Sequence, residues 1–573
     1  MRNLIDVASG RKVAELVLKS CKVINVFSHE IVEGDLAIDS GKIIGIGSYK
    51  GKKEIDMKGK YICPGLIDGH IHIESSMLSP KEFTKAVVLK GTTTIIADPH
   101  EIANVCGLEG IKYILDETDD VPLNVFVMLP SCVPATFFET SGAILEKNEL
   151  KSFINNPRVL GLGEVMNYPA IINGESKMLD KINMAKDYNK IIDGHGPNIR
   201  GEDLNAYKIA GIKTEHECST VEEMNERIRE GMYIAIREGS AAKNLKSLLK
   251  GITKENSRRC MLCADDRHPE DILNEGHIDN SVRIAIKSGI DPISAIKMAS
   301  LNTAECYGLK NLGAIAPGYD ADFIILDDLE NFNIVKVFKN GKLVVDNNKP
   351  LFNFNIKSNS LVTNTINIKK VTKEDLNIKM NRNTANVIKV ISKSILTKKV
   401  ERKVLLDEDQ LFKYDSLNDI VKIAVVERHK ATGNVGLGLV ENFGIKGGAI
   451  ASTIAHDSHN IVVIGDNDED MILAINEVKK IGGGITICSK GKVLESLELK
   501  IAGLMSELPI EKVSKKLGKM LSIAYNNLKV NKDIQPFMTL AFLALPVIPE
   551  IKITDKGLFD VNNFKFISID ESI

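Results

Sequence analysis

Apolar residues in the first half of the chain form short strand-like runs that end in polar side chains, with stretches of helical periodicity between them. The runs lie at residues 61–68, 92–98, 123–129, 159–165, 190–194, 211–216, 232–238 and 260–265. Eight such strands alternating with helices predict a (β/α)8 barrel over residues 61–315. Active sites in this fold lie at the carboxyl ends of the strands, so the polar residues there are the candidates for chemistry.

Shorter strand-like runs, punctuated by Gly and Asn turns, flank the barrel region on both sides. They lie at residues 22–26, 35–39, 42–46 and 53–57 before it, and at 322–326 and 334–345 after it. We expect the two flanks, residues 1–60 plus 316–350, to pair into one composite β-sandwich domain with the barrel inserted between them.

Beyond residue 350 the pattern changes again. Residues 351–403 are rich in Asn, Lys, Ser and Thr, which is typical of a linker. Apolar runs and helical patterns return in residues 404–573 and predict a separate C-terminal α/β domain. The predicted fold class is therefore α/β: a TIM-like (β/α)8 barrel with a small β-sandwich domain and an extra C-terminal domain.

Composition limits the partners and the compartment. The 573 residues, too many for one core, are 44% hydrophobic and 26% charged with a net charge of -2, which suits a soluble protein and favours neither nucleic acid nor membrane. No apolar run reaches the roughly 18 residues of a membrane span, and the N-terminus lacks a signal peptide's apolar core. Nine scattered cysteines do not suggest a disulfide framework. We expect a cytoplasmic protein.

Histidines and carboxylates follow the predicted strands at the positions where barrel enzymes bind metal. His70 and His72 point the same way in an extended chain, so both can reach one ion. The other candidate ligands, each at a later strand end, are Glu164, His195, His216 and Asp265. A single histidine of this kind is more often structural. Together, however, the six groups could hold two divalent cations with a bridging carboxylate.

This arrangement resembles the amidohydrolase superfamily, whose barrels carry H-x-H after strand one, a bridging group after strand four, histidines after strands five and six, and aspartate after strand eight. Many members use a carboxylated lysine as the bridge, where this chain has Glu164. The departure is similar to the adenine deaminase family, as are the segments ADPHE at 97–101, LCADDRHP at 262–269, RHKATG at 428–433 and AHDSHN at 455–460. The resemblance covers nearly the whole chain.

The resemblance implies hydrolytic deamination of adenine to hypoxanthine and ammonia by metal-activated water, as in purine salvage. It implies two divalent ions, with Mn²⁺ favoured over Fe²⁺ or Zn²⁺, and Asp265 as both metal ligand and proton carrier. Glu74 could protonate a purine ring nitrogen, although a loop carboxylate in solvent is an equal alternative at that position. We expect a homo-oligomer whose partner is this small-molecule substrate.

Two other functions remain open at this point: a cyclic amide or imide hydrolase, such as a dihydroorotase or hydantoinase, and a barrel that serves only as a scaffold. The zinc deaminases of nucleic acid are excluded because the chain has no P-C-x-x-C motif.

Several neighbouring residues receive lesser roles. Asp68, Asp98, His100 and Glu101 are expected to support ligands, and Arg267 and His268 to line a pocket or loop. Strand alternation lets only one of Asp265 and Asp266 face the metals; we favour Asp265 and expect Asp266 to pair with Arg267 or a backbone amide. His456 and His459 are expected at a surface or interface rather than at a third metal. The C-terminal domain is expected to cover the barrel mouth of its own or a neighbouring subunit.

Overall fold

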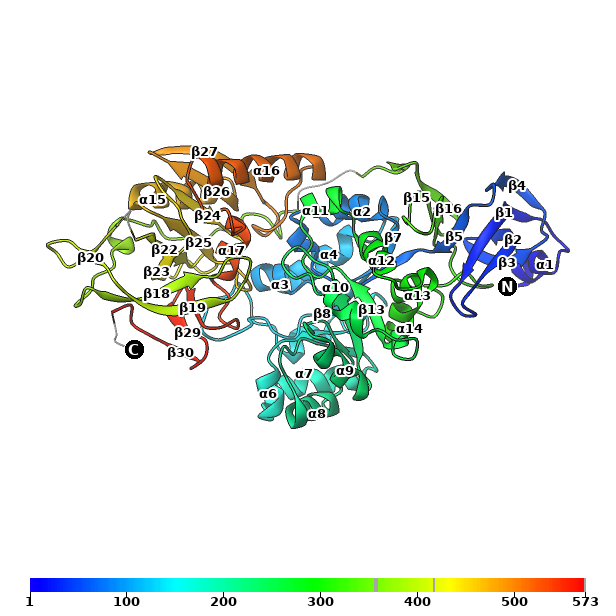
Figure 1. The fold of residues 1–573 in the computed structure, drawn as a ribbon, viewed down its shortest axis with the longest axis horizontal. Helices are drawn as coiled ribbons and strands as arrows, with labels where there is room; N and C mark the ends of the chain where they lie inside the picture. The colour runs from blue at the N-terminus through cyan, green and yellow to red at the C-terminus, as the bar shows by residue number, and fades with distance from the viewer. Residues whose placement is uncertain (355–358, 416–417, 571–573) are drawn as a thin grey trace.

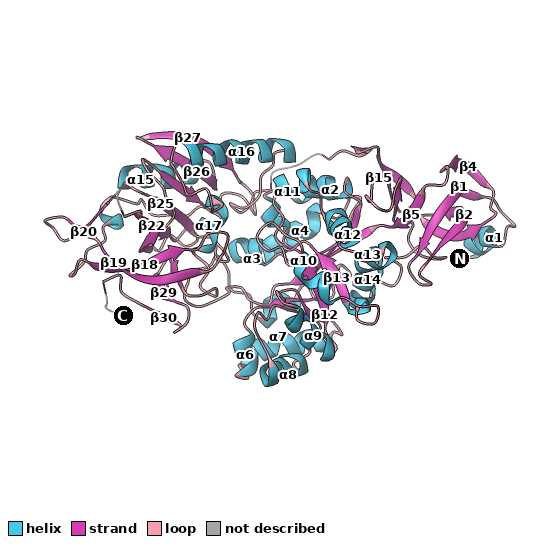
Figure 2. Cartoon of the chain, viewed as in Figure 1, coloured by secondary structure: helices cyan, strands magenta, loops and turns pink. Residues whose placement is uncertain are grey.

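Three units follow one another along the length of the molecule (Figure 1). The computed structural model describes residues 1–354, 359–415 and 418–570. A sheet built around the N-terminus lies at one end, the barrel lies in the middle, and the C-terminal domain lies at the other end. Strands dominate the N-terminal unit, whereas many helices surround the central one (Figure 2).

The end unit is one hydrogen-bonded sheet drawn from both flanks of the barrel, in the order β17-β16-β15-β14-β5-β1-β2-β3 with β4 on β1. Its elements are α1 (Arg2–Ala8), β1 (Ala14–Asn25), β2 (Glu30–Asp39), β3 (Lys42–Gly47), β4 (Gly51–Asp56), β5 (Tyr61–Pro64), β14 (Phe323–Leu326), β15 (Ile334–Lys339), β16 (Lys342–Asp346) and β17 (Lys349–Pro350). Strand β5 pairs with β1 on one side and with β14 on the other, and so joins the two flanks.

The central unit confirms the predicted barrel. Its parallel strands are β6 (Leu66–Ile71), β7 (Thr92–Ala97), β8 (Asn124–Leu129), β9 (Val159–Val165), β10 (Ile191–Gly194), β11 (Thr214–Glu215), β12 (Tyr233–Arg237) and β13 (Cys260–Cys263). They form two sheets, β6 to β10 and β11 to β13. The sheets meet at both edges, where the Asp265 N–H donates to the His70 carbonyl at 2.9 Å and the Lys213 N–H donates to the Ile192 carbonyl at 2.9 Å.

Helices alternate with these strands, as the apolar periodicity predicts. The longer ones are α2 (Pro80–Val88), α3 (His100–Cys106), α4 (Leu108–Glu117), α7 (Ser176–Asp187), α8 (Gly201–Ile209), α9 (Val221–Arg229), α12 (Ile278–Lys287), α13 (Pro292–Met298) and α14 (Leu301–Tyr307). Shorter helices after the strands are η1 (Ile73–Ser76), α5 (Lys147–Lys151), α6 (Tyr168–Ile172), α10 (Leu245–Leu248), η2 (Leu249–Gly251), η3 (Ser257–Arg259) and α11 (Pro269–Asn274).

The first barrel strand is shorter than predicted. Residues 61–68 were expected to be one strand, but the structure divides them between β5 of the end sheet and β6 of the barrel. Gly65 separates the two strands, and a Cβ atom there would lie 2.2 Å from Thr93 Oγ1. Only glycine lets the chain pass this close to its neighbour, so the change of sheet takes place at this residue.

The C-terminal domain is built on a mixed sheet in the order β19-β18-β23-β22-β25-β24-β26-β27. Its strands are β18 (Thr384–Val390), β19 (Thr397–Lys403), β22 (Ile420–Val426), β23 (Val435–Glu441), β24 (Ala449–Ser452), β25 (Ile461–Gly465), β26 (Gly484–Ser489) and β27 (Lys492–Glu498). The other elements are η4 (Glu374–Leu376), α15 (Asp468–Lys480), α16 (Ile510–Asn526), α17 (Pro536–Phe542), and the small strands β20 (Leu405–Leu406), β21 (Phe412–Lys413), β28 (Ile551–Thr554), β29 (Gly557–Asp560) and β30 (Lys565–Phe566).

Residues 351–403, expected as a linker, therefore contain two strands of this sheet. Strand β18 pairs with β19 and, in parallel, with β23, and its side chains are mostly buried. The packed part of the C-terminal unit begins before residue 404.

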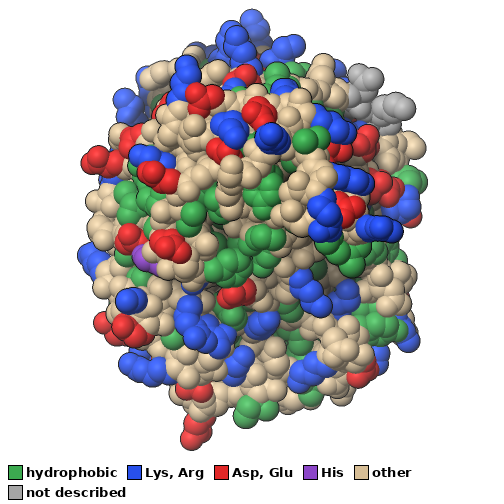
Figure 3. All heavy atoms as spheres, turned by 90° about the vertical axis from the view of Figure 1, so that its right-hand side faces the viewer, with side chains coloured by type: hydrophobic (Ala, Val, Ile, Leu, Met, Phe, Trp, Pro, Cys, Tyr) green, Lys and Arg blue, Asp and Glu red, His purple; other side chains and the backbone are tan. Residues whose placement is uncertain are grey.

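When the molecule is viewed from the end that carries the N-terminal sheet, basic and acidic side chains are interspersed on the surface (Figure 3). Within the described residues no helix has the length and apolar character needed to cross a membrane.

Candidate metal centre and the pocket beside it

The six predicted ligands come together at the carboxyl ends of the barrel strands. On one side of the cluster, Nε2 of His70 lies 3.2 Å from Nε2 of His72. The His72 nitrogen is also 3.3 Å from Oδ1 of Asp265 and 3.4 Å from Oε1 of Glu164. These four residues are less than 10% exposed.

Glu164 presents its second oxygen to the other side of the cluster. Its Oε2 lies 2.6 Å from Nδ1 of His195 and 3.1 Å from Nε2 of His216. The two imidazole nitrogens are 3.2 Å apart. One carboxylate thus stands between two pairs of histidines, which is the arrangement that a ligand bridging two ions requires.

The orientation of the imidazoles fits metal binding. The Nδ1–H of His72 donates to the Asp98 carbonyl at 2.9 Å, which leaves the lone pair of Nε2 pointing into the cluster. Burial, followed by the nearby His216, holds the pKa of His70 well below its usual value, whereas the carboxylates of the cluster outweigh burial and raise the pKa of His72, His195 and His216. Two imidazole nitrogens 3.2 Å apart can share a proton or bind one cation.

Asp98 positions Glu164. Its Oδ2 accepts the backbone N–H of Glu164 at 2.9 Å. A Cβ atom at Gly163 would lie 2.1 Å from that same oxygen, so glycine is needed for the approach.

After β13, Asp265 adopts a φ of 59°, a left-handed conformation that aspartate tolerates better than most residues.

Asp68 supports His70 through hydrogen bonds, as expected. Its Oδ1 accepts the backbone N–H of His70 at 3.2 Å and that of Ala264 at 3.0 Å, and its Oδ2 lies 3.0 Å from Nε2 of His277. This fully buried carboxylate therefore ties the first barrel strand to the eighth.

Three further side chains contact the cluster in ways that the sequence did not predict. Nη1 of Arg237, at the end of β12, lies 2.8 Å from Oδ2 of Asp265, and its Nη2 lies 2.7 Å from Oε2 of Glu217. His100, expected only to support ligands, has Nδ1 3.3 Å from Oε1 of Glu164. Arg237 and Glu217 do follow strand ends, and that position was the one signal available.

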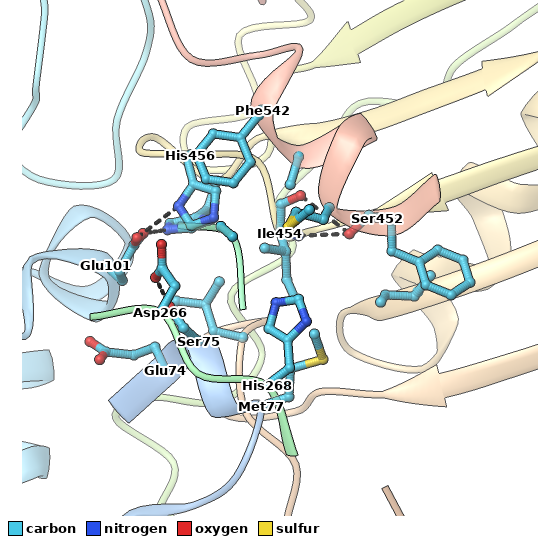
Figure 4. Close-up of a pocket in the computed structure, with 17 residues that line it drawn as sticks. Glu74, Ser75, Met77, Glu101, Asp266, His268, Ser452, Ile454, His456 and Phe542 are labelled. Carbon is cyan, nitrogen blue, oxygen red and sulfur yellow. Dashed lines mark hydrogen bonds and ion pairs between the residues drawn. The ribbon is translucent and has the colours of Figure 1, made fainter. Parts of the chain in front are cut away.

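A pocket lies beside the cluster, between the barrel and the C-terminal domain (Figure 4). The barrel contributes polar side chains to it, among them Glu74, Glu101, Asp266 and His268. The C-terminal domain contributes a wall that includes Ile454, His456, Phe537 and Phe542. The expectation that this domain covers a barrel mouth is confirmed, and the barrel belongs to the same chain.

Glu74 lies inside this pocket rather than in solvent. It is 3% exposed, and its Oε1 accepts the backbone N–H of Ile102 at 3.0 Å. Its Oε2 is buried with no hydrogen-bond partner among the described residues. Burial raises the pKa of Glu74 to about 7, so near neutral pH this carboxyl group can donate a proton.

Asp266 also differs from its expected role. It does not pair with Arg267, whose guanidinium binds Glu275 and the Gly276 carbonyl. Instead Asp266 accepts a hydrogen bond from Ser75 Oγ and lines the pocket together with His268, which was expected to be a pocket-wall residue (Figure 4).

Comparison with known proteins extends over both halves of the chain. The amidohydrolase family model matches residues 61–344, and the adenine deaminase C-terminal domain model matches residues 394–565. An adenine deaminase from Clostridium acetobutylicum is 60% identical over 98% of this chain and 99% of its own length. The chain belongs to the adenine deaminase family. Two further members, from Nitratidesulfovibrio vulgaris (strain DP4) and Geobacillus kaustophilus, are 50% and 49% identical over 99% and 100% of this chain and 99% of their own length.

Membership in this family agrees with both parts of the site. The amidohydrolase match spans all six clustered ligands, and the C-terminal match spans His456 and Phe542 of the pocket wall. That second match begins at residue 394, inside the segment expected to be a linker, in agreement with the sheet found there.

Proposed function

We propose that this protein catalyses the hydrolytic deamination of adenine to hypoxanthine and ammonia, as its close relatives are named for doing. The observation that carries the proposal is the position of Glu164 between two pairs of histidines in the barrel of a family member. In this proposal His70, His72, Glu164, His195, His216 and Asp265 hold two divalent ions.

The ligand set supports hard or borderline metals. Imidazole and carboxylate without thiolate suit Mn²⁺, Fe²⁺ and Zn²⁺, and we favour Mn²⁺ from the resemblance to the family. When bound, such ions lower the pKa of water toward neutrality and so supply a nucleophile.

Asp265 is the proposed proton carrier. Burial raises its pKa, but the neighbouring His72 and the charge of Arg237 lower it more, and the pKa stays well below its usual value. An ionised Asp265 can take a proton from the attacking water and return it to the departing amino group at C6. Arg237, 2.8 Å from Oδ2, fixes the direction of the carboxylate.

Glu74 is the proposed proton donor to the ring. Its unpartnered Oε2 and its pKa of about 7 suit a carboxyl group that protonates a purine nitrogen as water adds at C6. The pocket it lines has apolar walls that would exclude bulk water from the reaction.

Purine salvage and a cytoplasmic location complete the proposal. Nine free cysteines, eight of them buried, support a reducing compartment.

Purified protein supplied with Mn²⁺ should convert adenine to hypoxanthine, followed by the ultraviolet shift and by ammonia release. Dihydroorotate and hydantoin serve as competing substrates. Ring opening of either one with adenine untouched would assign the protein to the cyclic amide hydrolases instead, and no turnover of any substrate by fully metal-loaded protein would favour the scaffold.

A further inference from the structure

A loop of the C-terminal domain, between β24 and β25, reaches the barrel mouth and places two histidines on one barrel carboxylate. Nδ1 of His456 lies 2.7 Å from Oε1 of Glu101, and Nε2 of His459 contacts Oε2 of the same side chain. Glu101 and His459 are almost fully buried, while His456 borders the pocket. Two imidazoles and a carboxylate in one cluster raise the question of a third metal ion.

The hydrogen bonds of His459 argue against a metal. Its Nδ1 accepts the backbone N–H of Ala455 at 3.2 Å, so this nitrogen carries no proton. In a neutral imidazole the proton then lies on Nε2, which donates it to Glu101 and has no lone pair left for a metal. Glu101 therefore acts as a hydrogen-bond acceptor for both rings.

His456 is held so that one nitrogen faces Glu101 and the other is free. Nδ1–H donates to Glu101, and the ring stacks on Phe542 with the centroids 4.7 Å apart and the planes 27° apart. Among the described residues no hydrogen bond or ion pair to Nε2 of His456 is found, although the residue borders the pocket (Figure 4). A polar ring is thus oriented by two neighbours and left with one unused nitrogen.

The pocket around this ring suits a flat nitrogen heterocycle. Ile454, Phe537 and Phe542 supply apolar contacts, while Glu74 and Asp266 supply carboxyl groups. A purine needs both, since its faces are apolar and its edge carries an amino group and a ring N–H that donate to carboxylates, as well as ring nitrogens that accept from a protonated carboxyl group.

We propose that His456, supplied by the C-terminal domain and oriented by Glu101, binds the substrate through a hydrogen bond from Nε2 to a ring nitrogen of the purine. This inference rests on the proposed function and extends it, because it makes the C-terminal domain part of the substrate site.

The protonation of His456 supports a donor at Nε2. Burial lowers its pKa, but Glu101 raises it more strongly, to about 9. Near neutral pH both ring nitrogens then carry protons: Nδ1–H serves Glu101, and Nε2–H remains for the substrate.

Two substitutions separate the two edges of the ring. His456→Asn keeps a donor near Nδ1 and loses the Nε2 edge, whereas His456→Gln places its amide nearer the Nε2 position. We expect KM for adenine to rise about 10- to 100-fold in His456→Asn, less in His456→Gln, with metal content unchanged. His429→Gln is the matched control, because His429 is a histidine of the same domain that binds the Ser458 carbonyl and does not line the pocket. Its KM should stay within about twofold of wild type.

Inhibition by deaza analogues tests the contact without relying on turnover by the variant. We would measure Ki for 1-, 3- and 7-deazaadenine against wild type and His456→Asn. Replacing the ring nitrogen that His456 contacts should weaken binding to wild type and cause no additional loss in the variant. Additive losses for all three analogues would overturn the inference.

The outcome for wild type separates this inference from the proposed function. If wild type does not deaminate adenine, the proposed function fails. If wild type is active while His456→Asn keeps its KM, the proposed function stands and only the role of His456 is refuted.

Discussion

The barrel cluster and the loop at residues 455–459 contain the same kinds of side chain, yet their hydrogen bonds point to different uses. In the barrel, Nδ1 of His72 donates to the Asp98 carbonyl, which frees Nε2 for a cation. In the loop, Nδ1 of His459 accepts from the Ala455 N–H, which places the proton on Nε2.

A cluster of histidine and carboxylate can bind a metal only when the surrounding backbone leaves the lone pairs of the imidazole nitrogens free. The barrel provides a carbonyl acceptor for His72, whereas the loop provides an amide donor for His459. The first region therefore suits two ions. The second suits docking of the C-terminal domain and contact with substrate.

The strongest test of the barrel side is Glu164→Ala. Metal content should fall from about two ions per chain to one or none, and turnover by about 10⁴-fold or more, since one carboxylate contacts both histidine pairs. Elemental analysis and adenine turnover are the measurements, with the exposed Glu30→Ala as the control. Full metal occupancy in Glu164→Ala would refute its role as the bridge.

Asp265 and Asp266 are adjacent, but Asp265 lies in the barrel cluster and Asp266 lies in the pocket wall. Asp265→Asn should lower kcat by about 10²–10⁴-fold beyond any metal loss, because it removes the proton carrier. Asp266→Asn should be milder, since Asp266 contacts Ser75 in the pocket wall. Both values are compared at equal metal content, and near-normal turnover of Asp265→Asn would contradict the assignment.

Metal removal should destabilise the barrel. An ion present at a thousand times its Kd stabilises the folded state by about 4 kcal/mol, so chelated wild type should unfold at a lower temperature than metal-loaded protein. Calorimetry with and without Mn²⁺ measures the shift. The same addition should have a much smaller effect on Glu164→Ala, and an equal shift there would place the stabilising ions elsewhere.

The smallest effect is expected in the loop. His459→Asn should keep about two ions per chain and lose about 1–3 kcal/mol of unfolding free energy, because buried Glu101 loses a hydrogen-bond donor. A third ion in wild type that disappears in this variant would show that the loop binds metal after all.

The barrel and its ligands were predictable because each depends on a local pattern. A buried run predicts a strand, and a histidine or carboxylate at its end predicts a place at the rim. Those two rules were enough to locate the eight strands and bring six side chains from residues 70 to 265 into one cluster.

What the sequence did not predict depends on contacts between distant segments. The break at Gly65 was not predicted, although Pro64-Gly65 is a turn dipeptide, because only the pairing of β5 with β1 and β14 shows that the two strands belong to different sheets. Strand β18 lies among Asn-rich residues and is recognisable only once β23 pairs with it. The contact of His456 with Glu101 joins residues 355 positions apart, and no spacing rule reaches that far.

Gly65, the single residue between β5 and β6, joins the N-terminal sheet to the barrel without a loop. Strand β5 is held by its pairing with β1 and β14, and β6 by its pairing with β7, so a residue inserted or deleted at Gly65 would have to be absorbed by a shift in one of these pairings. A shift of β6 would move His70, which lies in that strand, and His72 just after it. The N-terminal sheet thus helps to fix the positions of His70 and His72 at the barrel rim.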